Sequence, residues 1–240
     1  MAQRIGFLGL GVMGLPMAKN VAAKSGQEVL GYDVSQKRLD AFAQAGGIAV
    51  PDPAEIYETC DVILQILPTH PIIRESVLRA VQCGKPGRII VDLSSTAPDI
   101  ILELYEAAKA AGMYLLDSPV SGGNPMAEAG TLAIMTGGDR EAFEQVRPIL
   151  ECMGQPVYTG GSASGSVTKL VYNMIGGAML AAVACGEYAT VQECADKLIK
   201  IKSVTEPDPA LVKKYAARYE LWHKLYPTLK PLYAEMEALQ

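Results

Sequence analysis

The chain has 240 residues, half of them apolar, and a formal net charge of −5 at pH 7. This length suits one large domain, or one domain with a smaller element beside it. The acidic balance, without a Lys/Arg run, argues against a nucleic-acid partner. No metal-ligand spacing is found among the five cysteines, so we expect no metal site and reduced thiols in a cytoplasmic protein: Cys60, Cys83, Cys152, Cys185 and Cys194.

The N-terminal stretch MAQRIGFLGLGVMG is apolar, but its glycines indicate a strand and a turn rather than a signal peptide. No apolar stretch is expected to reach the roughly 20 residues of a membrane span. We therefore predict no membrane partner.

Short apolar runs alternate with helical patterns in the first two thirds of the chain, which favours βαβ units. The predicted strands are RIGFLG, EVLGYD, GIAV, DVILQIL, RIIVDLS, MYLLDS, LAIMTG and PVYTG. The predicted helices begin near Met13, Ser35, Pro53, Pro71, Pro98 and Arg140. We expect an α/β fold, a Rossmann-type doubly wound and mostly parallel sheet over residues 1–160. A long helix over 161–186 and a short helical tail over 187–240 follow it.

A glycine-rich turn follows the first strand. Gly9, Gly11 and Gly14 form G-x-G-x-x-G between strand and helix, where the glycines permit a tight turn and a close approach of pyrophosphate. Asp33 ends the second strand, where a carboxylate would bind the ribose 2′-OH and favour NAD over NADP. The alternative for Asp33 is a turn residue that caps the helix at Ser35. The pattern predicts a dinucleotide site.

Two further segments follow strands and are expected at the carboxyl edge of the sheet, where ligands bind in open α/β folds. They are ILPTH, whose His70 is interpreted as a solvated loop residue, and VDLSST. A third segment, DSPVSGG, offers a hydroxyl and backbone N–H groups that suit a carboxylate. Its alternative is an ordinary glycine-rich turn.

Lys169 and Asn173 are four residues apart on the predicted long helix and share one face. A lysine can act as general acid–base if its pKa falls towards the working pH, and burial near a cationic nicotinamide would lower it. The alternative is a solvated lysine and a surface asparagine.

In this order, GFLGLGVMGLPMA, DLSST, DSPVSGG, GTLAIMTGG and GSASGSVTKLVYNMI resemble the β-hydroxyacid dehydrogenase family over residues 1–184. Its members include 3-hydroxyisobutyrate dehydrogenase and tartronate semialdehyde reductase. The resemblance implies that Lys169 is the catalytic acid–base with Asn173 as its partner, and that Ser121, Gly122 and Gly123 bind the substrate carboxylate. It also implies NAD bound by Gly9, Leu10, Gly11, Val12, Met13, Gly14, Asp33, Leu67, Pro68 and Thr96.

The last 55 or so residues differ from that family, whose long helix leads into an all-helical second domain. They resemble the C-terminal end of FGGY-family sugar kinases, with a helix over 190–201, a TEPDP connector and a helix over 210–226. The kinases' ATP and sugar loops are not found, so kinase activity is not expected. An aromatic stripe on the last helix is expected to cover the apolar face that the missing second domain leaves exposed, within the chain or across a homodimer: Leu211, Tyr215, Tyr219, Trp222 and Tyr226.

The sequence therefore predicts a fusion: a cofactor domain with its catalytic helix, followed by a borrowed tail. The leading hypothesis is an NAD-dependent dehydrogenase that transfers hydride between a small 3-hydroxy acid and nicotinamide. The alternative is a dinucleotide-binding protein with little or no turnover, because the second domain that would exclude water is not recognised.

Overall fold

The computed structural model describes residues 3–198. The chain divides into two units, residues 1–178 and 179–240, which are described separately. The boundary falls within the long helix α8 (Ser164–Ala184).

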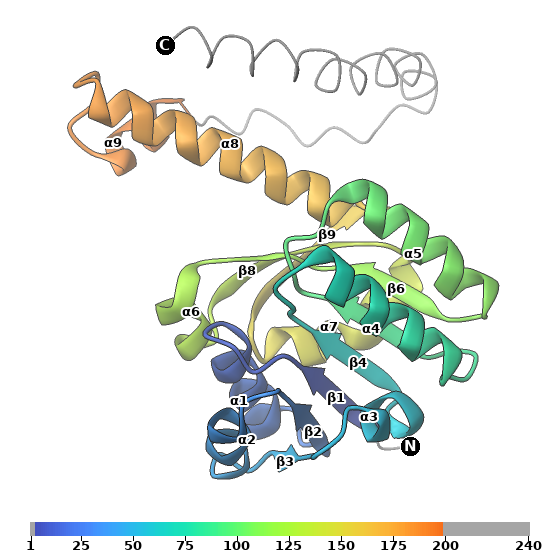
Figure 1. Ribbon diagram of the computed structural model, residues 1–240. Helices are drawn as coiled ribbons and strands as arrows, with labels where there is room; N and C mark the ends of the chain where they lie inside the picture. Colours follow the sequence, from blue (N-terminus) through green and yellow to red (C-terminus); the bar gives the residue numbers. More distant parts are fainter. Residues whose placement is uncertain (1–2, 199–240) are drawn as a thin grey trace, which may run out of the picture. The chain divides into compact units, whose positions relative to one another are not determined.

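A single mixed sheet organises the described part of the first unit. Its strand order is β3-β2-β1-β4-β5-β6-β8-β7, with β9 also paired to β8 (Figure 1). The strands from β1 to β6 pair in parallel, whereas β8 runs antiparallel to β6 and β7 and parallel to β9. Their bounds are β1 (Ile5–Leu8), β2 (Val29–Tyr32), β3 (Ile48–Ala49), β4 (Val62–Gln65), β5 (Ile89–Asp92), β6 (Tyr114–Asp117), β7 (Val120–Ser121), β8 (Leu132–Gly137) and β9 (Gly154–Gly160).

The central strands are apolar because both faces of the sheet are covered. Every residue of β1, β4 and β5 is buried, as expected for parallel strands between two helical layers. The helices are α1 (Gly14–Lys24), α2 (Gln36–Ala43), α3 (Ala54–Thr59), α4 (His70–Gln82), α5 (Pro98–Ala110), α6 (Gly123–Ala129) and α7 (Arg140–Glu151).

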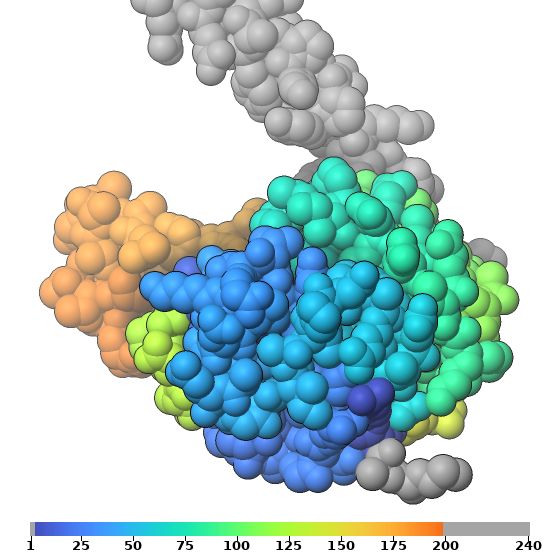
Figure 2. Space-filling model, turned by 60° about the horizontal axis from the view of Figure 1, so that its bottom comes forward, coloured from blue at the N-terminus to red at the C-terminus, as the bar shows by residue number. Residues whose placement is uncertain are grey.

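Two apolar cores lie on the two sides of this sheet. Buried residues of α1, α2, α6 and α7 form one core, and those of α3, α4 and α5 form the other. Figure 2 shows the face of the molecule on which the early segments of the chain, coloured blue to teal, gather.

The strand order places the functional site. The chain runs outward through β1, β2 and β3 and then returns to β4 on the other side of β1. Ligands of doubly wound sheets bind at such a reversal, outside the carboxyl ends of the strands. The loops after β1, β2, β4, β5 and β6 leave the sheet at this edge.

The predicted Rossmann-type sheet is confirmed, and each strand candidate is a strand. The sequence did not predict β7, which ends at the first residue of the SGG segment, or α6, which begins at its last residue, Gly123. A two-residue strand is too short for a period-two pattern, and the two glycines there indicated a turn. The domain boundaries at residues 160 and 186 stay predictions.

The expectation that no apolar stretch reaches the length of a membrane span is wrong for α8. By length and composition, Ser164–Ala184 is the one helix among residues 3–198 that is long and apolar enough to cross a membrane, with a mean hydropathy of 1.4. The sequence interpretation required an uninterrupted apolar run, whereas a helix of 21 residues keeps a high mean despite Lys169 and Asn173. Length and composition do not distinguish such a span from a helix of a soluble protein.

The described part of the second unit contains the end of α8 and the helix α9 (Val191–Leu198). Thr190 caps α9 by accepting the Glu193 N–H at 3.1 Å, and the Glu193 carboxylate accepts the Ala189 N–H at 3.1 Å. The Thr190 bond satisfies an N–H group of the first turn that has no partner within the helix, which explains why the helix begins here. The predicted helix over 190–201 is confirmed as far as Leu198, whereas the connector and the aromatic stripe lie outside the described residues.

Candidate functional site

The glycine turn between β1 and α1 is shaped by close backbone contacts. A Cβ on Gly14 would lie 1.9 Å from the Gly9 carbonyl oxygen, so the start of α1 packs directly on the turn. A Cβ on Gly11 would meet nothing within 4 Å, and Gly11 lines an open cavity. The first turn of α1 carries no acidic residue. Its N–H groups and the helix dipole therefore suit a bound phosphate.

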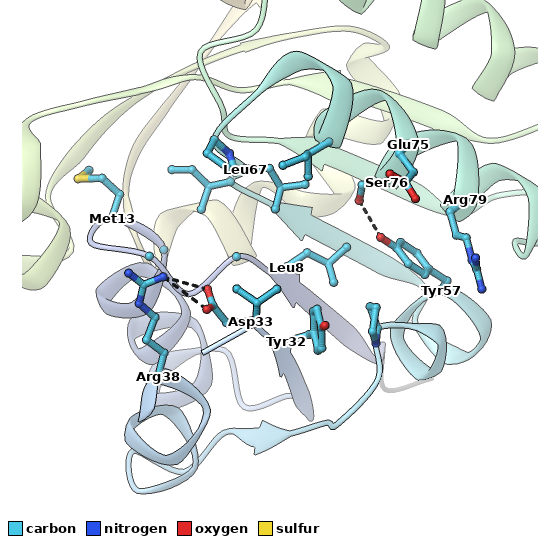
Figure 3. Close-up of a pocket in the computed structure, with 18 of the residues that line it drawn as sticks. Leu8, Met13, Tyr32, Asp33, Arg38, Tyr57, Leu67, Glu75, Ser76 and Arg79 are labelled. Atoms are coloured by element: carbon cyan, nitrogen blue, oxygen red, sulfur yellow. Dashed lines mark hydrogen bonds and ion pairs between the residues drawn. The ribbon is translucent and has the colours of Figure 1, made fainter. Parts of the chain in front are cut away.

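Asp33 lies at the carboxyl end of β2, with its carboxylate fixed by backbone. It is 8% exposed and accepts N–H groups from Leu10 at 2.8 Å and Ser35 at 2.9 Å. The Arg38 guanidinium lies 3.4 Å from the same carboxylate (Figure 3). The bond to Ser35 is the contact expected if Asp33 were only a turn residue at the start of α2. The bond to Leu10 also ties Asp33 to the glycine turn, at the edge of the cavity.

This first cavity has a volume of about 750 Å³ and runs along the glycine turn towards α3 and α4. Figure 3 shows Met13 and Arg38 on one side and Tyr57 and Arg79 on the other, with Asp33 between them. The residues present fit a dinucleotide: open space at Gly11, a helix N-terminus without acidic residues and a fixed carboxylate. The predicted residues that line it are Gly9, Gly11, Val12, Met13, Gly14, Asp33, Leu67 and Pro68.

Sequence reasoning missed the far wall of this cavity. The Tyr57 and Ser76 hydroxyl groups lie 2.9 Å apart, and Ser76 donates to the Gln65 side chain at 2.7 Å. These residues belong to α3, α4 and β4 and carry no motif that would have marked them. The other lining residues that were not predicted are Leu8, Tyr32, Val34, Arg38, Asp52, Pro53, Ala54, Ile66, Ile72, Glu75 and Arg79.

A second cavity of about 550 Å³ shares part of its wall with the first. Four residues line both cavities: Met13, Ile66, Leu67 and Pro68. The predicted carboxylate-binding residues Ser121, Gly122 and Gly123 line it together with Lys169 and Asn173. The structure thus brings together two groups of residues that are more than forty positions apart in the sequence.

Lys169 is half-buried on α8, and burial lowers the pKa of its ammonium group, partly offset by Tyr172. Its Nζ lies 5.3 Å from the centre of the Tyr172 ring. Asn173 is exposed, one helical turn further on. Lys169 is therefore not fully solvated, and its position on the wall of the second cavity differs from the alternative interpretation of a surface lysine.

Leu10 and Thr96 do not line either cavity. Leu10 is buried and contributes its N–H to Asp33, and the Thr96 hydroxyl donates to Asp92 at 2.5 Å. Burial raises the pKa of the Asp92 carboxyl, which also accepts the Ser94 N–H at 3.2 Å. These bonds shape the loop after β5.

Residues of that loop line the second cavity in place of Thr96. Ser94 and Ser95 contribute to the wall, and the Ser94 hydroxyl accepts the Leu67 N–H at 2.9 Å. Their place in VDLSST, beside the predicted Thr96, was the available signal. His70 was interpreted from sequence as a solvated loop residue. It is exposed, but it is the first residue of α4 and lies on this wall. Ile66, Ile73, Leu93 and Val120 complete the lining.

No group of three or more His, Cys, Asp or Glu side chains suited to a metal ion occurs within residues 3–198. The polar side chains that line the second cavity are those of His70, Ser94, Ser95, Ser121, Lys169 and Asn173.

The fold and the first cavity together define a dinucleotide-binding domain of the Rossmann type. The chain belongs to the family described as the NAD binding domain of 6-phosphogluconate dehydrogenase, whose model matches residues 4–164. The cofactor of this family is a nicotinamide dinucleotide.

Among curated proteins, the chain is 36% identical to a 2-(hydroxymethyl)glutarate dehydrogenase of Eubacterium barkeri, over 75% of this chain and 61% of that protein. It is 37% identical to a 3-hydroxyisobutyrate dehydrogenase of Pseudomonas aeruginosa, again over 75% and 61%. The chain thus spans about three fifths of the length of these relatives. Among solved structures, a Mycobacterium tuberculosis 3-hydroxyisobutyrate dehydrogenase with L-serine is similar, with a TM-score of 0.71 and 29% identity over 87% of this chain and 77% of that one.

Proposed function

We propose that the chain is an NAD-dependent oxidoreductase that acts on a small 3-hydroxy acid. The observation that carries the proposal is the wall shared by the dinucleotide cavity and the cavity with Lys169 and Ser121. Four residues form this wall: Met13, Ile66, Leu67 and Pro68. A substrate in the second cavity would lie against the end of a dinucleotide in the first. The relatives' names support a hydroxy acid as the substrate class.

The residues of the second cavity divide the work between binding and proton transfer. The Ser121 hydroxyl and the backbone N–H groups of Gly122 and Gly123 bind the substrate carboxylate, as donors in a glycine turn do for anions. Lys169 accepts the proton of the substrate hydroxyl, and Asn173 orients the substrate beside it. A bound nicotinamide supplies the hydride acceptor.

We propose NAD rather than NADP as the cofactor. The buried Asp33 carboxylate would accept a hydrogen bond from the ribose 2′-OH and repel a 2′-phosphate. Arg38 is already paired with Asp33 at 3.4 Å, so the positive charge of Arg38 is partly neutralised. Binding of NADP would require this pair to separate.

Three expectations about the tail and assembly remain predictions. They are a homodimer formed through the long helix and the tail, a tail borrowed from a sugar-kinase-like protein, and a cytoplasmic location. The matched family model ends at residue 164, so the tail is not part of that match.

The experiment that tests the function is a titration of the full chain with NAD and NADP, followed by a turnover screen over short 3-hydroxy acids. We expect tighter binding of NAD and formation of NADH with at least one acid. NAD binding without turnover would favour the second candidate, a dinucleotide-binding protein. That candidate needs only the first cavity, with its glycine turn and the fixed carboxylate of Asp33.

A further inference from the structure

Asp117 is a buried carboxylate that lines neither cavity. It ends β6 and is 1% exposed. One carboxylate oxygen accepts the Ala163 N–H at 3.0 Å, and the other accepts the Ser166 N–H at 2.7 Å. Both donors belong to the beginning of α8, where N–H groups have no partner within the helix. Asp117 therefore caps α8 from the neighbouring sheet.

The backbone of α8 lies directly on the sheet at this cap. A Cβ on Gly165 would lie 2.3 Å from the carbonyl oxygens of both Asp117 and Met135, so only glycine fits there. Ala163, with a φ of 67°, adopts a left-handed conformation that is unfavourable for alanine. Its N–H bond to Asp117 is the contact that holds this conformation in place.

The cap joins the two halves of the second cavity. Four residues after Asp117 the chain reaches Ser121, and three residues after Ser166 it reaches Lys169. The substrate-binding turn is thus connected to Asp117 through the chain, and the helix with Lys169 is connected to it through two hydrogen bonds. Within residues 3–198, no side-chain hydrogen bond other than these two joins α8 or the residue before it to β6 or β7.

We propose that Asp117 is a positioning residue that fixes the Lys169 amine relative to Ser121, Gly122 and Gly123. The proposal rests on the function proposed above, since it assigns Lys169 and this turn to one reaction. An alternative is a purely structural cap that supports folding and has no effect on the geometry of the cavity. The global free energy of unfolding does not separate the two, because removal of a buried charge also removes its desolvation cost.

The test compares Asp117→Ala and Asp117→Asn with Asp61→Asn in the full chain. Asp61 is the control away from the second cavity. Its carboxylate also accepts a backbone N–H, that of Arg4 at 3.1 Å, and it is paired with Lys85 at 2.9 Å. The measurements are the NAD dissociation constant, kcat and KM for the 3-hydroxy acid, and amide hydrogen exchange at residues 163–170.

For Asp117→Ala we expect kcat to fall about 100-fold, as for a misplacement of about 1 Å. The NAD dissociation constant should change by no more than about twofold, because the first cavity is separate. Exchange at Ala163 and Ser166 should become about tenfold faster as their bonds are lost. Asp117→Asn keeps one acceptor, so it should restore part of kcat, and it serves as the test if the alanine variant does not fold.

An unchanged kcat in both variants would overturn the proposal. So would parallel losses of kcat and NAD binding, which indicate general unfolding. If the unaltered chain shows no turnover, the proposed function fails and hydrogen exchange decides on Asp117 alone. Faster exchange confined to 163–170 would then establish the cap on α8 without the positioning role, and unchanged exchange there would overturn both.

Discussion

The two cavities of the site are built in different ways. The dinucleotide cavity is centred on one continuous strand–turn–helix segment, β1 to α1, and on Asp33 at the end of the next strand. The second cavity is assembled from the turn at Ser121 and from α8, more than forty residues later. A local segment forms its binding geometry with its own secondary structure, whereas the second cavity depends on how α8 is docked on the sheet. Changes in the two regions should therefore separate binding from turnover.

The largest expected effect is on turnover alone. Lys169→Ala should lower kcat by about 10²–10⁴-fold, the range of general acid–base catalysis. The NAD dissociation constant should stay within about twofold, because Lys169 does not line the dinucleotide cavity. Steady-state kinetics and fluorescence titration measure the two quantities. Lys109→Ala, on the exposed side of α5, is the control, and equal turnover in both variants would remove Lys169 from the mechanism.

The second effect concerns the docking of α8 and depends on pH. Burial raises the pKa of the Asp117 carboxyl from 3.8 to about 6, although the Ser166 and Ala163 N–H groups act in the opposite direction. The folded chain therefore holds this proton more tightly than the unfolded chain. Protonation of Asp117 therefore stabilises the folded chain. This contribution to the free energy of unfolding is fully present below about pH 4 and is lost as the pH rises through about 6, a change of about 3 kcal/mol.

Denaturant unfolding of the unaltered chain and of Asp117→Asn between about pH 4 and pH 7 measures this contribution. The free energy of unfolding of the unaltered chain, relative to the variant, should decline as the pH rises. Parallel curves would show that Asp117 titrates at its ordinary pKa. NAD binding at the first cavity should not follow this titration.

The third effect compares two substitutions in the glycine turn, one expected to weaken NAD binding and the other to lower the stability of the chain. Gly11→Ala should weaken NAD binding about tenfold or more, because its Cβ would enter the space for the pyrophosphate. Its free energy of unfolding should change by no more than about 0.5 kcal/mol, since the Cβ meets no protein atom. Gly14→Ala should instead cost about 1–3 kcal/mol of stability, because its Cβ would overlap the Gly9 carbonyl. Calorimetric titration and denaturant unfolding check the pair, and equal stability losses would contradict this account of the turn.

The smallest effect is on cofactor choice. Asp33→Asn should weaken NAD binding about tenfold through the loss of charge-assisted hydrogen bonds. NADP binding should be unchanged or tighter, because the repulsion of a 2′-phosphate is removed. Parallel titrations with NAD and NADP measure the ratio, with the exposed Asp40→Asn on α2 as the control. An unchanged ratio would mean that Asp33 acts only in the turn with Ser35.

The sequence predicted the fold because its strands are apolar runs separated by helical patterns. It predicted the dinucleotide cavity because glycine spacing, strand, helix and acid are close in the chain. The far wall at Tyr57 and Ser76 was missed, since it is formed by tertiary packing of α3 on α4 and has no local pattern.

The second cavity was predicted through family resemblance, because a lysine and an asparagine one turn apart do not by themselves indicate a partner. Thr96 illustrates the limit of this transfer. The motif correctly indicated that the loop after β5 borders the cavity. The Thr96 hydroxyl, however, donates to Asp92, and Ser94 and Ser95 line the cavity instead. Side-chain direction within a loop depends on hydrogen bonds that sequence spacing does not contain.

The most direct test of the account measures whether a hydride is transferred from the substrate to the nicotinamide. The full chain is mixed with NAD and a short 3-hydroxy acid that carries deuterium on the carbinol carbon, and the nicotinamide product is analysed by mass spectrometry and NMR. The account predicts deuterium at C4 of the nicotinamide, formed about 10²–10⁴-fold more slowly in Lys169→Ala. NAD binding without any transfer of deuterium across a panel of 3-hydroxy acids would contradict the claim that the two cavities form one active site.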